Sequence, residues 1–174
     1  MIDFEVNPAE LDRLIRDVGA IQSDAEKALK STLIKMARWL KTRSVKGLSV
    51  QLQMKQNIIR RRLRATRVRE TASGAETKVW YGLNNVGVVW LNPKQNGRGV
   101  SASGGRQYDQ AWIGKHQVFK RRGKSRLPID PVKEPIKDKA DNFLEHGIVS
   151  SIEFSDQFYK TFEHELSWRM QQRR

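Results

Sequence analysis

Arginine and lysine side chains are crowded into the middle of this chain, and their chemistry suits phosphate groups. Between Lys55 and Arg126 there are 17 basic and three acidic residues, so this segment holds the whole net charge of +14. A charge concentrated in this way attracts polyanions. We predict that ten of these residues contact phosphate groups, such as those of DNA, or an acidic neighbouring protein: Arg60, Arg61, Arg62, Arg64, Arg67, Lys120, Arg121, Arg122, Lys124 and Arg126.

The residue types in this set of ten favour contact with nucleic acid without recognition of its base sequence. No Asn or Gln stands among them at a helical spacing suited to base edges, so we expect binding to be indifferent to base sequence. Two other roles stay open for the same side chains. They can form a solvated basic surface, or they can pair with acidic residues of adjacent subunits, for which the candidates are Glu145, Glu153, Asp156 and Glu163.

Catalytic chemistry has little support in the sequence. The three histidines are His116, His146 and His164, and none belongs to an HExxH pair. There is no cysteine, no GxSxG elbow and no phosphate-binding GxxxxGK[ST] loop, and Gly97-Arg98-Gly99 lacks the third glycine of a dinucleotide fingerprint. We therefore predict no catalytic residue, no metal ligand and no cofactor, and hence a protein that is not an enzyme.

The length of 174 residues fits one domain, and we predict a single domain over 1–174. No apolar run approaches the ~20 residues of a membrane span. The first ten residues, MIDFEVNPAE, lack the apolar stretch of a signal peptide. We expect a soluble protein that is made inside the cell, with no membrane partner.

The first part of the chain has a helical period. Apolar residues recur at spacings of three and four after Asn7 and Pro8, which predicts one long amphipathic helix over Pro8–Arg43 with a bend at Gly19. Lys46-Gly47 should end it, and a second, basic helix is expected over Val50–Ala65. We expect part of the long helix to face a partner subunit.

The period then changes to that of strands. The runs Thr77–Leu83 and Val86–Leu91 predict a hairpin that turns at Asn84-Asn85. The Gly, Ser and Asn residues of 92–107 predict a long mobile loop, with Lys94, Arg98 and Arg106 as its interaction residues. Short strands are expected at 110–113 and 116–121.

The last part returns to a helical period. An extended proline-containing stretch, Arg126–Val132, should lead to a helix over Pro135–His146 and to a final helix that begins at Ser155. The expected class is α+β, with a long N-terminal helix, a basic second helix, a small antiparallel sheet with a long Gly/Ser loop, and two C-terminal helices.

The stretch from Ala111 to Ile136 has the most distinctive sequence in the chain. It reads Ala111-Trp112-Ile113, then His116-Gln117-Val118-Phe119-Lys120-Arg121, then Arg126-Leu127-Pro128-Ile129 and Val132-Lys133-Glu134-Pro135-Ile136. In order and spacing it resembles the minor tail protein Z family, the tail completion proteins of lambda-like siphophages. The basic segment 55–69 upstream is similar to the Lys/Arg-rich part of that family.

The resemblance implies a structural virion protein in the neck region of the tail. Such a protein completes the head-proximal end of the tail as a homo-oligomeric ring, for which we expect six subunits. Its implied partners are the tail terminator and tail tube proteins, the head–tail connector proteins and the end of the genomic double-stranded DNA. The alternative is a monomeric or dimeric nucleic-acid-binding protein with no sequence preference, in which Trp80, Tyr81 and Trp90 would stack on bases.

Overall fold

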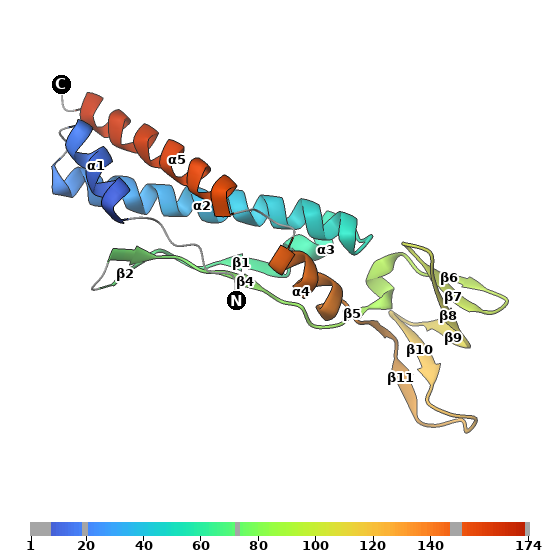
Figure 1. The fold of residues 1–174 in the computed structure, drawn as a ribbon. Helices are drawn as coiled ribbons and strands as arrows, with labels where there is room; N and C mark the ends of the chain where they lie inside the picture. The colour runs from blue at the N-terminus through green and yellow to red at the C-terminus, as the bar shows by residue number, and fades with distance from the viewer. Residues whose placement is uncertain (1–7, 19–20, 72–73, 147–150, 173–174) are drawn as a thin grey trace. The chain divides into compact units, whose positions relative to one another are not determined.

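The computed structural model describes residues 8–18, 21–71, 74–146 and 151–172 (Figure 1). Helices lie in the N-terminal and C-terminal parts and small antiparallel sheets lie between them, which confirms the predicted α+β class and both C-terminal helices. The chain divides into two compact units. We call them the helical unit (Met1–Ser44, Leu63–Trp80 and Glu145–Arg174) and the β unit (Val45–Arg62 and Tyr81–Leu144). The single domain over 1–174 stays a prediction.

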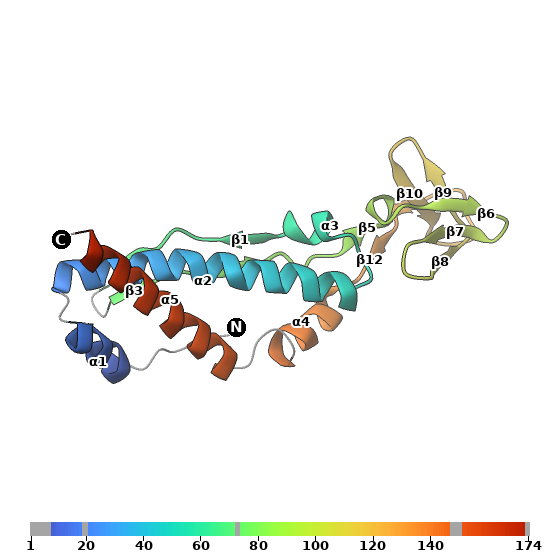
Figure 2. The same cartoon turned by 90° about the horizontal axis from the view of Figure 1, so that it is seen from above.

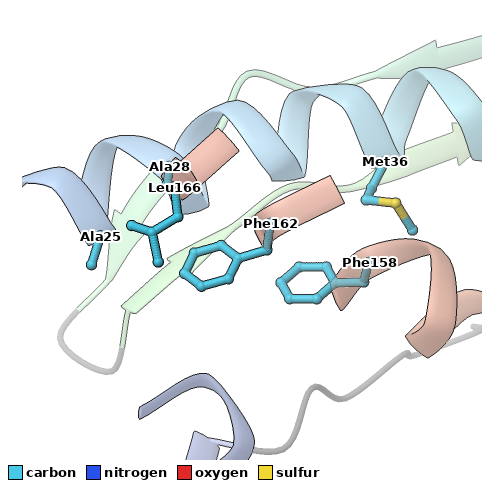
Figure 3. Packing of buried hydrophobic residues seen from close by; sticks show 6 residues of the cluster. All are labelled: Ala25, Ala28, Met36, Phe158, Phe162 and Leu166. Atoms are coloured by element: carbon cyan, nitrogen blue, oxygen red, sulfur yellow. The ribbon is translucent and has the colours of Figure 1, made fainter. Parts of the chain in front are cut away.

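The helical unit is organised around α2 and α5. Its helices are α1 (Pro8–Val18), most of α2 (Gln22–Gln51) and α5 (Ser151–Gln171), and α2 and α5 lie side by side in both views (Figures 1 and 2). Figure 3 shows Phe158, Phe162 and Leu166 of α5 pointing toward small and flexible residues of α2. The rings of Phe158 and Phe162 are nearly parallel, with centroids 6.3 Å apart. The spacing of four residues in the sequence thus places one buried stripe on α5.

The prediction of one helix over Pro8–Arg43 has the correct start at Pro8 and is wrong about the continuity of the helix and about its end. Two helices, α1 and α2, occupy this stretch, and the bend expected at Gly19 falls outside the described residues. At the other end, α2 runs through Gly47 to Gln51. Gly47 does not stop the helix because the Phe143 ring lies against it: a Cβ there would be 2.2 Å from Phe143 Cζ. The missing side chain serves packing, and the helix continues.

The basic helix expected over Val50–Ala65 is replaced by a short helix and a strand. Helix α3 spans only Gln56–Arg60, and β1 (Leu63–Ala65) pairs with β4 (Val79–Tyr81). Thr66 fixes this pairing, because its backbone N–H donates to Lys78 O at 2.8 Å and its hydroxyl accepts from Lys78 N at 2.9 Å. A second antiparallel pair joins β2 (Arg69–Thr71) to β3 (Gly74–Glu76).

The hairpin predicted from Thr77–Leu83 and Val86–Leu91 does not form. Instead of pairing with β4, β5 (Val86–Gly87) pairs with β12 (Lys133–Glu134), and Val88–Leu91 forms the 3-10 helix η1. Both runs are rich in β-branched and aromatic residues, and that composition does not fix which strands pair.

The β unit contains two antiparallel three-stranded sheets. Their strand orders are β6-β7-β8 and β11-β10-β9. The strands are β6 (Lys94–Asn96), β7 (Gly99–Ala102), β8 (Arg106–Asp109), β9 (Ala111–Gly114), β10 (Gln117–Arg121) and β11 (Ile129–Pro131). A small buried core joins η1 to both sheets through Val88, Val100, Ala111 and Val118. Helix α4 (Lys137–His146) completes the unit, and β9 and β10 match the two short strands that the sequence predicts.

The irregular loop expected over 92–107 is instead most of the β6-β7-β8 sheet. Its small polar residues make tight turns: Asn96 Oδ1 accepts hydrogen bonds from Arg98 N at 3.0 Å and from Gly99 N at 2.9 Å. Gly99 has a φ of +151°, and a Cβ there would lie 2.2 Å from Tyr108 O on the neighbouring strand. Glycine at this position lets two backbones approach closely, so the composition is that of a turn in a sheet.

No helix in the described part of the chain is both long and apolar enough to cross a membrane.

Candidate polyanion-binding surface

The ten predicted basic residues lie on several separate elements. Arg64 and Arg67 belong to the helical unit, and the other eight belong to the β unit. Within the β unit, one group is at the end of α3 (Arg60, Arg61 and Arg62), and the other is on β10 and the turn that follows it. The sequence therefore locates the charge correctly along the chain, while the fold distributes it over different elements.

The second group is carried by the hairpin of β10 and β11. Lys120 and Arg121 lie opposite Asp130 and Ile129 in the strand register, and every residue from Lys120 to Ile129 is exposed. Four of its basic side chains have no hydrogen-bond or ion-pair partner among the described residues. We call them the hairpin cluster: Lys120, Arg121, Lys124 and Arg126.

Arg122 differs from the hairpin cluster because it is bound across the hairpin. Its Nε and Nη2 donate to the two carboxylate oxygens of Asp130 at 2.9 Å and 3.1 Å, and its backbone N–H donates to Pro128 O at 3.1 Å. The hydrogen bond with Asp130, together with the charge of that carboxylate, raises the pKa of Arg122 above its ordinary value. Arg122 thus holds the hairpin closed, and the phosphate contact predicted for it is assigned to its neighbours.

Arg62 likewise has a structural position. Its Nη1 donates to the carbonyls of Gly82 (3.1 Å) and Asn84 (2.6 Å), and its Nη2 donates to Asn85 O at 3.3 Å. Burial lowers the pKa of its guanidinium below the ordinary value. The side chain organises the 82–85 turn. Arg60 and Arg61 are exposed, and neither side chain has a hydrogen-bond or ion-pair partner within the described ranges.

A pocket of about 420 Å³ lies beside α3 in the β unit. Basic, apolar and amide side chains meet there with an exposed indole. The lining residues are Lys55, Asn57, Ile58, Arg61, Arg62, Val89, Trp90 and Asn92. The sequence does not reveal this pocket, because Trp90 is far from Arg61 along the chain and reaches it only through η1.

The residues expected to form an interaction loop have mostly structural contacts. Lys94 is exposed on β6, and Arg98 pairs with Asp109 at 3.1 Å. Arg106 is largely buried: its Nε donates to Glu134 Oε1 at 2.8 Å and its Nη2 to Leu52 O at 2.7 Å. Arg106 therefore ties β8 to β12 and to the chain that follows α2.

Tyr108 completes this cluster by donating its hydroxyl to Glu134 Oε2 at 2.6 Å. Burial, and next the hydrogen bond to Glu134, raises the pKa of Tyr108 well above its usual range. Burial alone would raise the pKa of Glu134, but the hydrogen bonds from Tyr108 and Arg106 outweigh it and hold that pKa below its ordinary value. The carboxylate is thus charged and fully engaged.

A second ionic cluster joins α2 to α5 in the helical unit, and the sequence gives no signal for it. The carboxylate of Glu165, which is 7% exposed, pairs with Lys35 and with Arg169, the latter at 2.7 Å. Arg169 also donates to Ser31 Oγ at 2.7 Å. Burial opposes the charge of Glu165, yet the hydrogen bonds from Lys35 and Arg169 prevail and lower its pKa.

The acids considered as partners for an adjacent subunit fall into two kinds. Glu153 pairs with Arg43 within the same chain. Glu145, Asp156 and Glu163 are exposed, which keeps them accessible to another subunit. Among the residues that the structure describes, no three His, Asp or Glu side chains are grouped so that they could hold a metal ion.

Comparison of the chain with protein-family models, with curated proteins and with solved structures gave no match.

Proposed function

We propose that this chain is a structural protein of a siphophage virion that completes the head-proximal end of the tail. In this role it forms a ring at the head–tail neck and positions the end of the genomic DNA. The observation that carries the proposal is the hairpin cluster, four cationic side chains that have no partner among the described residues and lie on one exposed hairpin. Cations of this kind hold a phosphate backbone without reading its sequence.

The hairpin suits such a contact because its two strands are held together by interactions that do not involve the side chains of the hairpin cluster. Arg122 and Asp130 hold the two strands together, so the cluster is presented on an ordered element. The stretch that resembles the tail completion family, Ala111 to Ile136, folds as β9, β10, β11 and β12, and it includes this hairpin. The charge and the resemblance therefore point to the same part of the chain.

The partners in this proposal are further copies of the chain, the tail terminator and tail tube proteins, the connector proteins and double-stranded DNA. Accessible acids in the helical unit, Glu145, Asp156 and Glu163, can receive basic side chains of an adjacent subunit. The proposal places the assembled protein in the virion.

The experiment is complementation of the phage that encodes this chain after deletion of its gene. We expect filled heads and finished tails to accumulate unjoined, and the wild-type protein supplied in trans to restore joining. Virions that form normally without the gene would overturn the proposal.

The DNA contact is tested with a variant in which Lys120, Arg121, Lys124 and Arg126 are all serine. It should enter particles and leave head–tail joining unproductive, whereas a K27S/R38S control, which removes two exposed basic side chains of α2 that are not among the ten, should complement. A quadruple variant that is absent from particles would make the cluster a subunit contact. Measurement of the mass of the purified protein separates the ring from the alternative of a monomeric or dimeric nucleic-acid-binding protein.

A further inference from the structure

The pocket beside α3 contains an indole whose position is set by its short helix. In η1, Val88 and Leu91 are buried at 0% and 2% exposure, while Trp90 is 59% exposed. The ring also lies close to the backbone of Gly87: a Cβ added there would be 3.6 Å from Trp90 Cδ1 and 4.0 Å from Trp90 Nε1. Trp90 is therefore anchored on one side and open on the other.

The open side distinguishes Trp90 from two other tryptophans of the chain. Arg43 stacks on Trp39 at 5.1 Å, and Arg169 stacks on Trp168 at 5.5 Å, in each case from the ring centroid. Within the described ranges, no cation or aromatic ring of this chain covers Trp90 in the same way. A flat apolar face thus remains available to a planar ligand.

Cationic groups line the same pocket. Lys55 and Arg61 are exposed, and the described part of the chain offers neither side chain a hydrogen-bond or ion-pair partner. Arg62 forms a fixed wall because three backbone carbonyls hold it. The volume of about 420 Å³ lies in the usual range of small-ligand sites.

We propose that this pocket binds an unpaired nucleotide of a single-stranded nucleic acid. The base stacks on Trp90, and Lys55 and Arg61 reach the adjoining phosphates. Single-strand binding sites combine these two features, because every base has a flat face and every linkage a negative charge. A duplex keeps its base faces stacked inside, and an acidic peptide would use the cations and leave the indole unused. This inference does not depend on the ring or on the virion.

The test measures the anisotropy of a fluorescent oligothymidylate as purified full-length protein is added at fixed low salt. Trp90→Ala should weaken binding about fivefold or more, the usual effect of losing one base–aromatic stack. The matched control is Trp80→Ala, since Trp80 is 55% exposed and lies on β4, outside this pocket. We expect it to bind as the wild type does. Trp90→Phe should keep most of the affinity.

A second arm separates stacking from charge. K55S/R61S should reduce the salt dependence, by about 0.7 in log–log slope for each single-strand phosphate that is no longer neutralised, whereas Trp90→Ala should leave the slope unchanged. Circular dichroism confirms that each variant is folded.

Equal losses in Trp90→Ala and Trp80→Ala would overturn the proposal. So would a duplex of equal charge whose binding Trp90→Ala weakens as much as it weakens binding of the single strand, since the hairpin cluster by itself is expected to bind duplex DNA. Polyglutamate that displaces the oligonucleotide as well as unlabelled oligothymidylate does would also overturn it. A negative result in these binding measurements does not affect the complementation test of the proposed function. A negative complementation result likewise does not affect the binding test of this pocket.

Discussion

Two basic segments of the β unit use their arginines differently. In 92–109, Arg98 and Arg106 are both bound to acidic side chains, and Arg106 also bonds to backbone carbonyls. In the hairpin 117–131, Arg122 alone among the described basic side chains has an acidic partner. The first segment uses its cations to hold strands together, and the second presents them to solvent.

The difference follows from which acids the strand register provides. Asp109 lies opposite Gly99, next to Arg98, and Glu134 on β12 reaches Arg106. In the hairpin, Asp130 lies opposite Lys120, yet Arg122 occupies both of its oxygens. The number of charges is thus a poor guide to a binding surface, and the number left unpaired after folding is a better one.

The largest expected effect is on the stability contributed by segment 92–109, whose arginines hold strands together. Arg106→Ala should lower the free energy of unfolding by about 3 kcal/mol, because it leaves a largely buried Glu134 and the carbonyl of Leu52 without their donor. Urea denaturation followed by circular dichroism measures this. Arg98→Ala is the matched control, and its exposed pair with Asp109 should contribute less than about 1 kcal/mol. Equal effects would show that Arg106 is not an anchor.

The next effect is on DNA binding by the presented side chains. Replacement of the hairpin cluster by serine should leave the urea midpoint close to that of the wild type, because none of the four has a partner among the described residues. Affinity for duplex DNA should fall, and the salt dependence should weaken by about 0.9 in log–log slope for each phosphate that the variant no longer neutralises. A decrease in stability with unchanged DNA affinity would reverse the assignment of the two segments.

A smaller effect depends on pH. The pKa of Glu134 is below its ordinary value of 4.5, so its charged form stabilises the fold above that pH, and this contribution is lost as the pH falls through the lowered pKa. Glu134→Gln should therefore be less stable than the wild type at pH 7. The gap should narrow as the pH falls below 4.5, as measured by urea midpoints across this range. A gap that is constant with pH would mean that the charge of Glu134 contributes little.

The smallest effect concerns the ion pair between Arg122 and Asp130 in the hairpin. Arg122→Ser should change the urea midpoint very little, because its pair with Asp130 is exposed. It should nevertheless open the hairpin, so that limited trypsin digestion cuts at Lys124 or Arg126 faster than in the wild type. Earlier cleavage at Arg98 or Arg106 would indicate that the β6-β7-β8 sheet is the looser of the two segments.

The elements that the sequence predicts well are those with a strong local period. The stripe of Phe158, Phe162 and Leu166 gives α5, and the short apolar runs give β9 and β10. The errors arise where a residue has its effect through a distant neighbour. From the sequence alone Gly47 predicts a helix end, but in the structure it lies within α2 and makes room for the Phe143 ring. Thr66 hydrogen-bonds with Lys78 next to strand β1, where the sequence pattern predicts the end of a helix.

The candidate site was predictable in charge and not in geometry. The run from Arg60 to Arg62 is visible in the sequence, but the carbonyls of 82–85 that occupy Arg62 are not. The indole of Trp90 joins Arg61 only once η1 has formed. Tertiary pairing decides which cations stay available, and a single sequence carries no record of that pairing.

The order in which the ribosome delivers the chain gives the core of the helical unit a further consequence. The stripe of α2 that carries Ala25, Ala28 and Met36 is covered by α5, which lies near the other end of the chain. All of the β unit except Val45–Gln51, which is the end of α2, is synthesised between these two helices, and domains generally fold as they emerge. In the nascent protein the β unit can therefore fold before α5 is synthesised, while the apolar stripe of α2 is still exposed to solvent. A premature stop before α5 leaves that stripe exposed, which makes such a fragment a natural substrate for chaperones and proteases.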